Sequence, residues 1–141
     1  MIGVERFRDA RRRLGARGEN TALRLLELHG CEVLARNWRC RAGELDLVVR
    51  DGLMIRFVEV KSRRCGRWQR RPFENLSFAQ RRRNFRAARL YRRVCRLEHF
   101  ECRFDLIEVE FRTMRRVSAV RWWHDYLPEL PPEEPPCSTG C

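Results

Sequence analysis

Apolar residues recur at helical spacing in two stretches of the chain, residues 18–29 and 77–97. Gly30 follows the first stretch and supplies a stop signal. In the second stretch an apolar stripe faces inward, while arginines fill much of the opposite side. The pattern predicts two amphipathic helices, and we expect the arginine-rich residues 1–14 to begin as a helix as well.

The other apolar segments have the length and the β-branched and aromatic content that are typical of strands. Three of them lie between the predicted helices and two follow the second helix: 31–39, 44–50, 53–62, 100–111 and 117–123. This order predicts an α/β fold, in which helices flank a mixed central sheet.

Two segments follow neither period. Residues 63–76 are predicted to form a basic, irregular loop, and from Pro128 onward the composition changes to Pro, Glu, Ser and Gly, which is typical of a disordered tail. The length suits one domain. We therefore expect three parts, a basic helical extension, a folded domain and a disordered tail: 1–14, 15–127 and 128–141.

The sequence Asp51-Gly52 between two predicted strands favours a two-residue hairpin turn. Such a turn pairs Arg50 with Leu53, Val48 with Ile55 and Asp46 with Phe57. Because alternate strand residues share a face, this register predicts that two acids and one lysine converge on one face of the hairpin. They are Asp46, Glu59 and Lys61, with Asp46 diagonal to Glu59.

A fourth acid, Glu19, belongs to the first predicted helix. It precedes Ala22, Leu23 and Leu26 by three, four and seven positions, so it shares their inward side. A carboxylate there is costly unless it is paired or bound to a metal ion.

These residue types suit phosphodiester hydrolysis. Asp46, Glu59 and the carbonyl of Val60 offer oxygen ligands to Mg²⁺ (or Mn²⁺), which acidifies bound water and neutralises charge on phosphate. Lys61 would stabilise that developing charge or position the water. A structural alternative is that both acids merely pair with arginines. Glu59 lies in an apolar run, however, and Lys61 is the single lysine among 31 basic residues, so the joint pattern favours catalysis.

The net charge of +12 and the pI of about 10.7 indicate a polyanionic partner, most commonly nucleic acid. We predict phosphate contacts from the basic loop and the second helix: Arg63, Arg67, Arg82, Arg86 and Arg89. The seven cysteines include no C-x-x-C pair typical of zinc sites. Since the sequence lacks a membrane-length apolar run and a signal peptide pattern, we expect a cytoplasmic protein without a membrane partner.

Several short motifs recur in the order found in a known family. They are Gly15-x-x-Gly18-Glu19, Arg36-Asn37, Gly43-Glu44-Leu45-Asp46, Phe57-Val58-Glu59-Val60-Lys61-x-Arg63 and Arg103-Phe104-Asp105. In this respect the chain resembles the YraN-like family of predicted bacterial endonucleases. That family is distantly similar to archaeal Holliday junction resolvases of the PD-(D/E)XK nuclease superfamily.

The resemblance implies a restriction-endonuclease-like fold that acts on structured or branched DNA. It also implies that Asp46 and Glu59 are metal ligands, that Lys61 is catalytic and that Glu19 is an active-site acid. One departure concerns the second helix, which usually begins with a lysine in that family, whereas Gln80 or Arg81 occupies the matching position here.

Two other functions remain open from the sequence. The chain is alternatively a nucleic-acid-binding module with the same fold and little or no catalysis, or an arginine-rich adaptor for an acidic or ribosomal partner. The choice between DNA and RNA, and whether the protein forms a homodimer, are also left open.

Overall fold

The computed structural model describes residues 2–66 and 77–127. Arg67, most of the predicted basic loop and the predicted tail lie outside these residues. The described part contains two helices and five strands, in the order α1 (Ile2–Leu28), β1 (Glu32–Cys40), β2 (Gly43–Asp51), β3 (Met54–Arg64), α2 (Phe78–Val94), β4 (Glu101–Thr113) and β5 (Arg116–Trp123).

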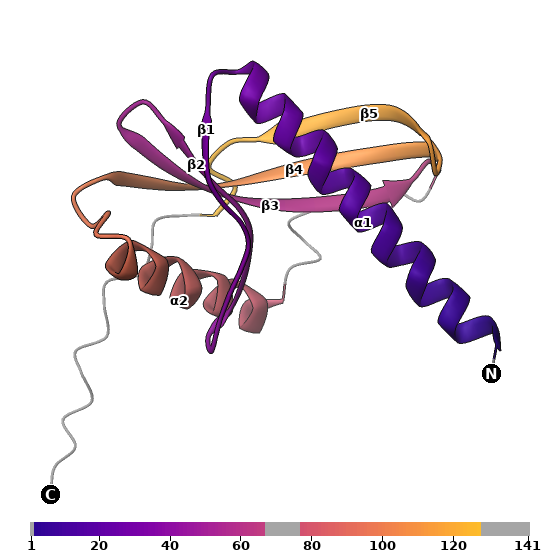
Figure 1. Ribbon diagram of the computed structural model, residues 1–141, viewed down its shortest axis with the longest axis horizontal. Helices are drawn as coiled ribbons and strands as arrows, with labels where there is room; N and C mark the ends of the chain where they lie inside the picture. Colours follow the sequence, from indigo (N-terminus) through magenta and orange to yellow (C-terminus); the bar gives the residue numbers. More distant parts are fainter. Residues whose placement is uncertain (1, 67–76, 128–141) are drawn as a thin grey trace, which may run out of the picture.

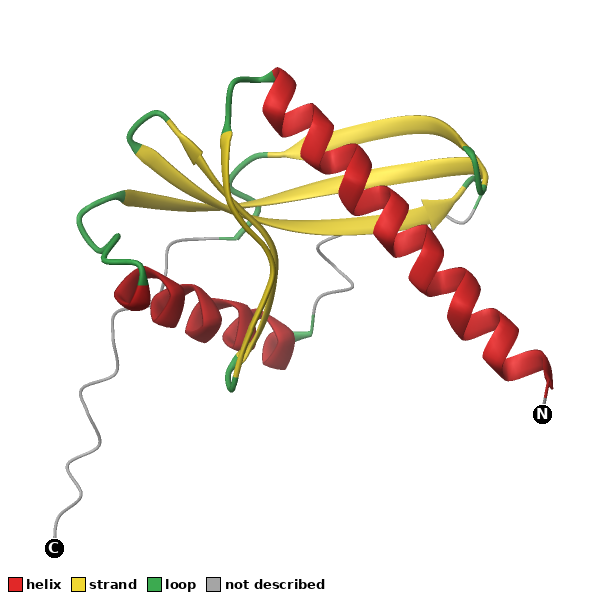
Figure 2. Cartoon of the chain, in the orientation of Figure 1, coloured by secondary structure: helices red, strands yellow, loops and turns green. Residues whose placement is uncertain are grey.

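The five strands form one sheet in sequence order, β1-β2-β3-β4-β5. Only β3 and β4 run parallel, and α2 lies in the connection between them, as a parallel crossover requires. The mixed sheet with helices, predicted from the order of apolar segments, is confirmed and is consistent with a restriction-endonuclease-like fold (Figures 1 and 2).

Each helix packs on its own hydrophobic cluster. Ala22 and Leu26 of α1 pack with Leu47, Val58 and Ile107 on one face of the sheet. On the other face the cluster consists of α2 residues and neighbouring strand residues: Ala87, Ala88, Tyr91, Val48, Ile55, Phe57 and Phe104. The sheet therefore has a covered face on each side, and any polar site in its middle has limited access to water.

The predicted register of the β2–β3 hairpin is wrong by two positions. Asp51 pairs with Met54 and Val48 with Phe57, so the turn is Gly52-Leu53. Gly52 has φ +61°, and it occupies the first turn position, which type II′ turns reserve for glycine. Because the shift is an even number of residues, each side chain keeps its predicted face.

Candidate active site

The site lies where β2 separates from β3. Pairing between these strands ends at Leu47–Val58, while β2 remains paired with β1 as far as Gly43. Just beyond the separation, Asp46 Oδ2 accepts a hydrogen bond of 2.9 Å from the backbone N–H of Val60. The Asp46 carboxylate thus replaces the β2 acceptor that the Val60 N–H would have had if the two strands had stayed paired. The bond also holds the carboxylate between the two strands.

Glu59 and Lys61 project from β3 toward α2. Lys61 Nζ lies 3.0 Å from Glu59 Oε1, and the glutamate side chain is only 13% exposed. From α2, Gln80 Nε2 and Asn84 Nδ2 each lie 3.5 Å from one Glu59 oxygen. Gln80, which occupies one of the two positions that match the helix lysine of the family, thus contacts Glu59.

Electrostatics at Asp46 are unfavourable for its ionised form. Burial, and then the charge of Glu59, raise the pKa of Asp46 to about 7, and the charge of Glu19 adds to the rise. The Val60 N–H and Lys61 oppose the rise without cancelling it. A second positive charge placed here would therefore be bound favourably.

Glu19 reaches this region because α1 crosses β3 at Gly18. A Cβ atom on Gly18 would lie 1.7 Å from Ser62 Oγ and 3.0 Å from Ser62 Cβ, so only glycine permits the observed approach. Glu19 Oε2 accepts a hydrogen bond of 3.1 Å from Asn37 Nδ2 and lies 3.7 Å from Arg36 Nη2. Its first contacts are thus to β1, while its charge acts on Asp46.

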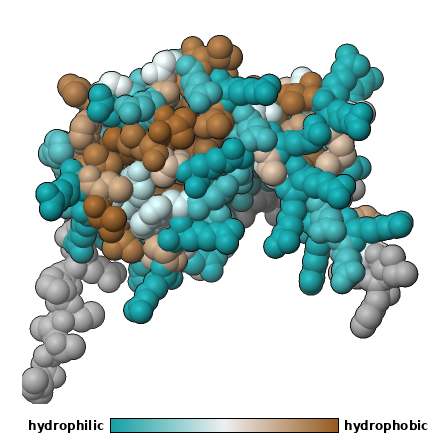
Figure 3. All heavy atoms as spheres, viewed as in Figure 1, coloured by the Kyte–Doolittle hydropathy of each residue, from teal (hydrophilic) through white to brown (hydrophobic). Residues whose placement is uncertain are grey.

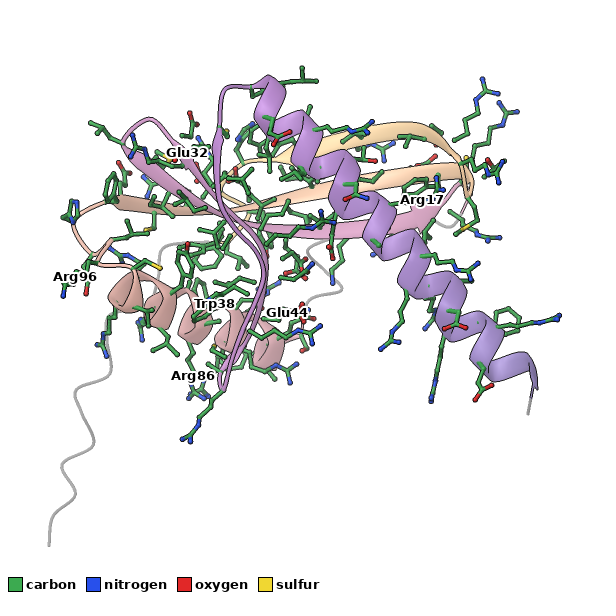
Figure 4. The ribbon with its side chains drawn as sticks, viewed as in Figure 1. Arg17, Glu32, Trp38, Glu44, Arg86 and Arg96 are labelled. Carbon is green, nitrogen blue, oxygen red and sulfur yellow. The ribbon has the colours of Figure 1, made fainter. Side chains whose placement is uncertain are left out.

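The predicted phosphate-binding arginines of α2 lie away from the acids. Gln80, Asn84 and Ala87 mark the inward side of the helix, whereas Arg82 and Arg86 are exposed and lie roughly opposite at about 100° per residue. Figure 4 shows Arg86 on the part of α2 that faces away from the sheet. Arg89 is half-buried on the same outer side.

Arg63 sits in a different environment, next to buried acids of β4. Glu108 and Glu110 are 2% and 8% exposed and pair in register with Lys61 and Arg63. Burial raises the pKa of Glu108, while Trp123, Arg121 and Arg63 oppose the rise. Arg63 is therefore partly engaged inside the protein.

Tyr126 also belongs to the site, although no sequence pattern indicated it. Buried Asp105 accepts hydrogen bonds from Arg56 Nη1 at 3.1 Å, from Trp122 Nε1 at 2.9 Å and from the Asp125 N–H at 3.1 Å, which fix the turn after β5. The Tyr126 N–H then donates to the Phe104 carbonyl at 3.0 Å. Burial raises the pKa of Tyr126, and so do the negative charges of Glu59 and Asp46, the two acids of the site.

The oxygen donors suit a hard divalent ion. Among residues 2–66 and 77–127, no three His, Cys, Asp or Glu side chains gather into a ready metal cage. A bound ion would use Asp46, Glu59, the Val60 carbonyl and several waters, which is how Mg²⁺ commonly binds. The partly buried, mutually repelling carboxylates fit that role. In the same described residues, no helix is long and apolar enough to cross a membrane.

Comparison with known proteins places these residues in a family. The model of the uncharacterised protein family UPF0102 matches residues 18–109, which include all four predicted site residues. A UPF0102 protein of Clostridium kluyveri is 38% identical over 108 residues, covering 77% of this chain and 88% of that protein. A UPF0102 protein of Symbiobacterium thermophilum is 46% identical over 99 residues, covering 70% of this chain and 83% of that protein. One of Nocardia farcinica is 46% identical over 96 residues, covering 68% of this chain and 75% of that protein. The chain belongs to the UPF0102 family, the YraN-like family that its motifs resemble.

Proposed function

We propose that the protein is a metal-dependent endonuclease of the PD-(D/E)XK type, which hydrolyses phosphodiester bonds in structured or branched DNA. The observation that carries this proposal is the position of Asp46 and Glu59 at a strand separation, with the chain's single lysine 3.0 Å from Glu59. Hydrolysis of a phosphodiester needs a metal ligand set, a positive group near the phosphate and restricted water, and this arrangement supplies all three.

Each residue has a defined task in this proposal. Asp46 and Glu59 would hold Mg²⁺ or Mn²⁺ together with the Val60 carbonyl, and the ion would supply an acidified water and neutralise phosphate charge. Lys61 exchanges its contact with Glu59 for one with the phosphate oxygens, where it stabilises the developing negative charge. Gln80 and Asn84 keep the Glu59 carboxylate oriented while Lys61 moves.

A nucleic-acid-binding module without catalysis is the second candidate. It is favoured by the partners that Glu59 already has, namely Lys61, Gln80 and Asn84, since such contacts also suit a purely structural ion pair. The hydrogen bond from the Val60 N–H is a structural role for Asp46, but an asparagine oxygen would also accept it, so it does not account for a carboxyl group whose pKa burial and Glu59 raise to about 7. Ionising such a group at neutral pH lowers stability, and binding a cation offsets that loss.

Cleavage of a panel of labelled substrates tests the proposal and names the substrate. The panel holds single strand, duplex, flap and four-way junction as DNA, with the duplex repeated as RNA, each with Mg²⁺, Mn²⁺ or EDTA. We expect the wild type to cut at least one DNA in a divalent ion, and Glu59→Gln to cut none. Glu44→Gln, on an exposed β2 acid, is the matched control and should cut normally. Tight binding by the wild type with no cutting in either ion would favour the binding module.

A further inference from the structure

The first half of α1 projects beyond the sheet. Residues 3, 5–9 and 11–13 are exposed, and Leu14 is the first of the described side chains of the helix that packs on the core. Figure 1 shows this segment extending past the strands, and in Figure 3 its hydrophilic side chains stand apart from the body of the domain. We call residues 2–13 the projecting segment. The matched family region begins at residue 18, so this segment lies outside it.

The described side chains of the projecting segment do not pack on the core of the domain, and Phe7, its one described aromatic residue, is 76% exposed. An isolated helix of this length is marginal in water, so a segment that does not pack on its own domain is a candidate to contact a partner. Residues 2–17 contain six arginines against two acids, Glu5 and Asp9. The charge thus favours a polyanion as the partner.

The arginines fall into two groups around the helix axis. Seven and eleven residues correspond to about two and three turns, so residues at these separations lie on the same side. Arg12 and Arg8 precede Glu19 by seven and eleven positions, and Arg11 precedes the sheet-contacting Gly18 by seven. Arg8, Arg11 and Arg12 therefore continue the side of α1 that carries Glu19 toward Asp46.

The second group faces away. Arg6, Arg13 and Arg17 lie about 120–160° around the helix from Glu19, at 100° per residue. All six arginines are exposed. Replacing either group with alanine removes the same charge, and the main difference between the groups is the direction in which they face.

We propose that Arg8, Arg11 and Arg12 bind the phosphate backbone of double-stranded nucleic acid whose reacting phosphate lies at Asp46 and Glu59. This inference rests on the proposed function for the position of the reacting phosphate. Measured along the helix, Arg12 and Arg8 lie about 10 and 17 Å from Glu19, at 1.5 Å per residue. That corresponds to about three to five base pairs, at 3.4 Å each.

Duplex is favoured over single strand by stiffness. A duplex has a persistence length of about 150 base pairs, so over three to five pairs it presents phosphates at fixed positions. A single strand bends away from such a distant contact at little cost. The surface formed by Arg8, Arg11 and Arg12 should therefore bind a rigid substrate that extends from the site along α1 more tightly than a flexible one.

Salt-dependent binding tests the proposal without cleavage. The probe is a fluorescein-labelled DNA duplex of about two helical turns, measured by anisotropy in EDTA across a range of KCl. Arg8→Ala/Arg11→Ala/Arg12→Ala is compared with Arg6→Ala/Arg13→Ala/Arg17→Ala and wild type. Alanine is the best helix former, and far-UV circular dichroism checks that α1 is retained.

We expect the site-side triple variant to reduce the slope of log K against log[KCl] by up to about 2.7, at 0.9 per lost phosphate contact. The wild type then loses up to about 40-fold more affinity than this variant between 50 and 200 mM salt. The outward-facing triple variant should keep most of the wild-type slope.

Equal slopes for the two triple variants would overturn the proposal, and so would an absence of duplex binding by the wild type. An equal loss of slope on a single strand of the same length would overturn the commitment to duplex. None of these outcomes depends on cutting, so the nuclease proposal stands or falls separately on the substrate panel.

Discussion

Replacing Asp46 with asparagine should stabilise the metal-free protein at alkaline pH. The asparagine side chain would retain an oxygen that accepts the 2.9 Å hydrogen bond from the Val60 N–H, but it would carry no charge. In the wild type, burial and the Glu59 charge raise the pKa of Asp46 from 3.8 to about 7. The variant removes this electrostatic penalty and leaves the shape of the site nearly unchanged.

The magnitude follows from the size of the shift. A rise of about three units corresponds to about 4 kcal/mol at 1.36 kcal/mol per unit. Because the Asp46 side chain is only partly buried and shares its shift with Glu59, water screens part of this energy. We expect Asp46→Asn to raise the free energy of unfolding by on the order of 2–3 kcal/mol at pH 8.

The pH dependence has a definite sign. A carboxyl group with a raised pKa in the folded state keeps a proton that the unfolded chain has lost between pH 3.8 and about 7. Stability therefore falls as pH rises through that range. The advantage of Asp46→Asn should be full above pH 7 and small near pH 4.

Urea denaturation of wild type, Asp46→Asn and the control Glu44→Gln, at both ends of this range, measures the effect. Glu44 is an exposed β2 acid 3.5 Å from Arg39, so its variant should change stability by less than about 1 kcal/mol. Millimolar Mg²⁺ should stabilise only proteins that keep Asp46, so it should reduce the difference in the free energy of unfolding between Asp46→Asn and wild type. If Asp46→Asn is no more stable than wild type at pH 8, the reasoning about charge at this site is wrong.

Three further perturbations follow from the packing. Gly18→Ala should lower the free energy of unfolding by about 1–3 kcal/mol, because the added Cβ would clash with Ser62 of β3. Gly15→Ala should raise the free energy of unfolding by about 0.5–1 kcal/mol, because Gly15 faces open space. Chemical denaturation of both variants measures these opposite changes. Asp105→Ala should cost about 3–5 kcal/mol in the same assay, because it removes the buried acceptor of Arg56 Nη1, Trp122 Nε1 and the Asp125 N–H and leaves Arg56 with Asp51 alone. Arg86→Ala should weaken duplex binding by anisotropy but leave the single-turnover cleavage rate unchanged, since this side chain lies on the outer side of α2; a large fall in that rate would contradict its placement.

Local patterns in the sequence were enough to predict the sheet and the grouping of the acids. Alternation along β3 places Glu59 and Lys61 on one face whatever the turn geometry is. The turn itself was misplaced by one residue, since Asp51-Gly52 and Gly52-Leu53 both offer a glycine for a positive φ. The error moved the register by two, so the predicted faces were preserved.

Contacts between distant segments were beyond such reasoning. Tyr126 reaches the site only because Asp105 fixes the turn after β5, and Glu108 lies beside Lys61 only because β3 and β4 pair in parallel. Helical period alone also left open which side of α2 faces the acids. The structure shows that the polar residues Gln80 and Asn84 do so, whereas Arg82 and Arg86 lie on the opposite side of the helix.

The most direct test of the account is the single-turnover cleavage rate of Lys61→Ala beside wild type, with protein in excess over a labelled substrate in Mg²⁺. We expect the rate to fall by about 100-fold or more, as when a transition-state charge loses its partner, while the dissociation constant in EDTA changes by less than about threefold. A cutting rate that survives Lys61→Ala unchanged would contradict the central claim, and so would a wild type that binds the substrate without cutting it in any divalent ion.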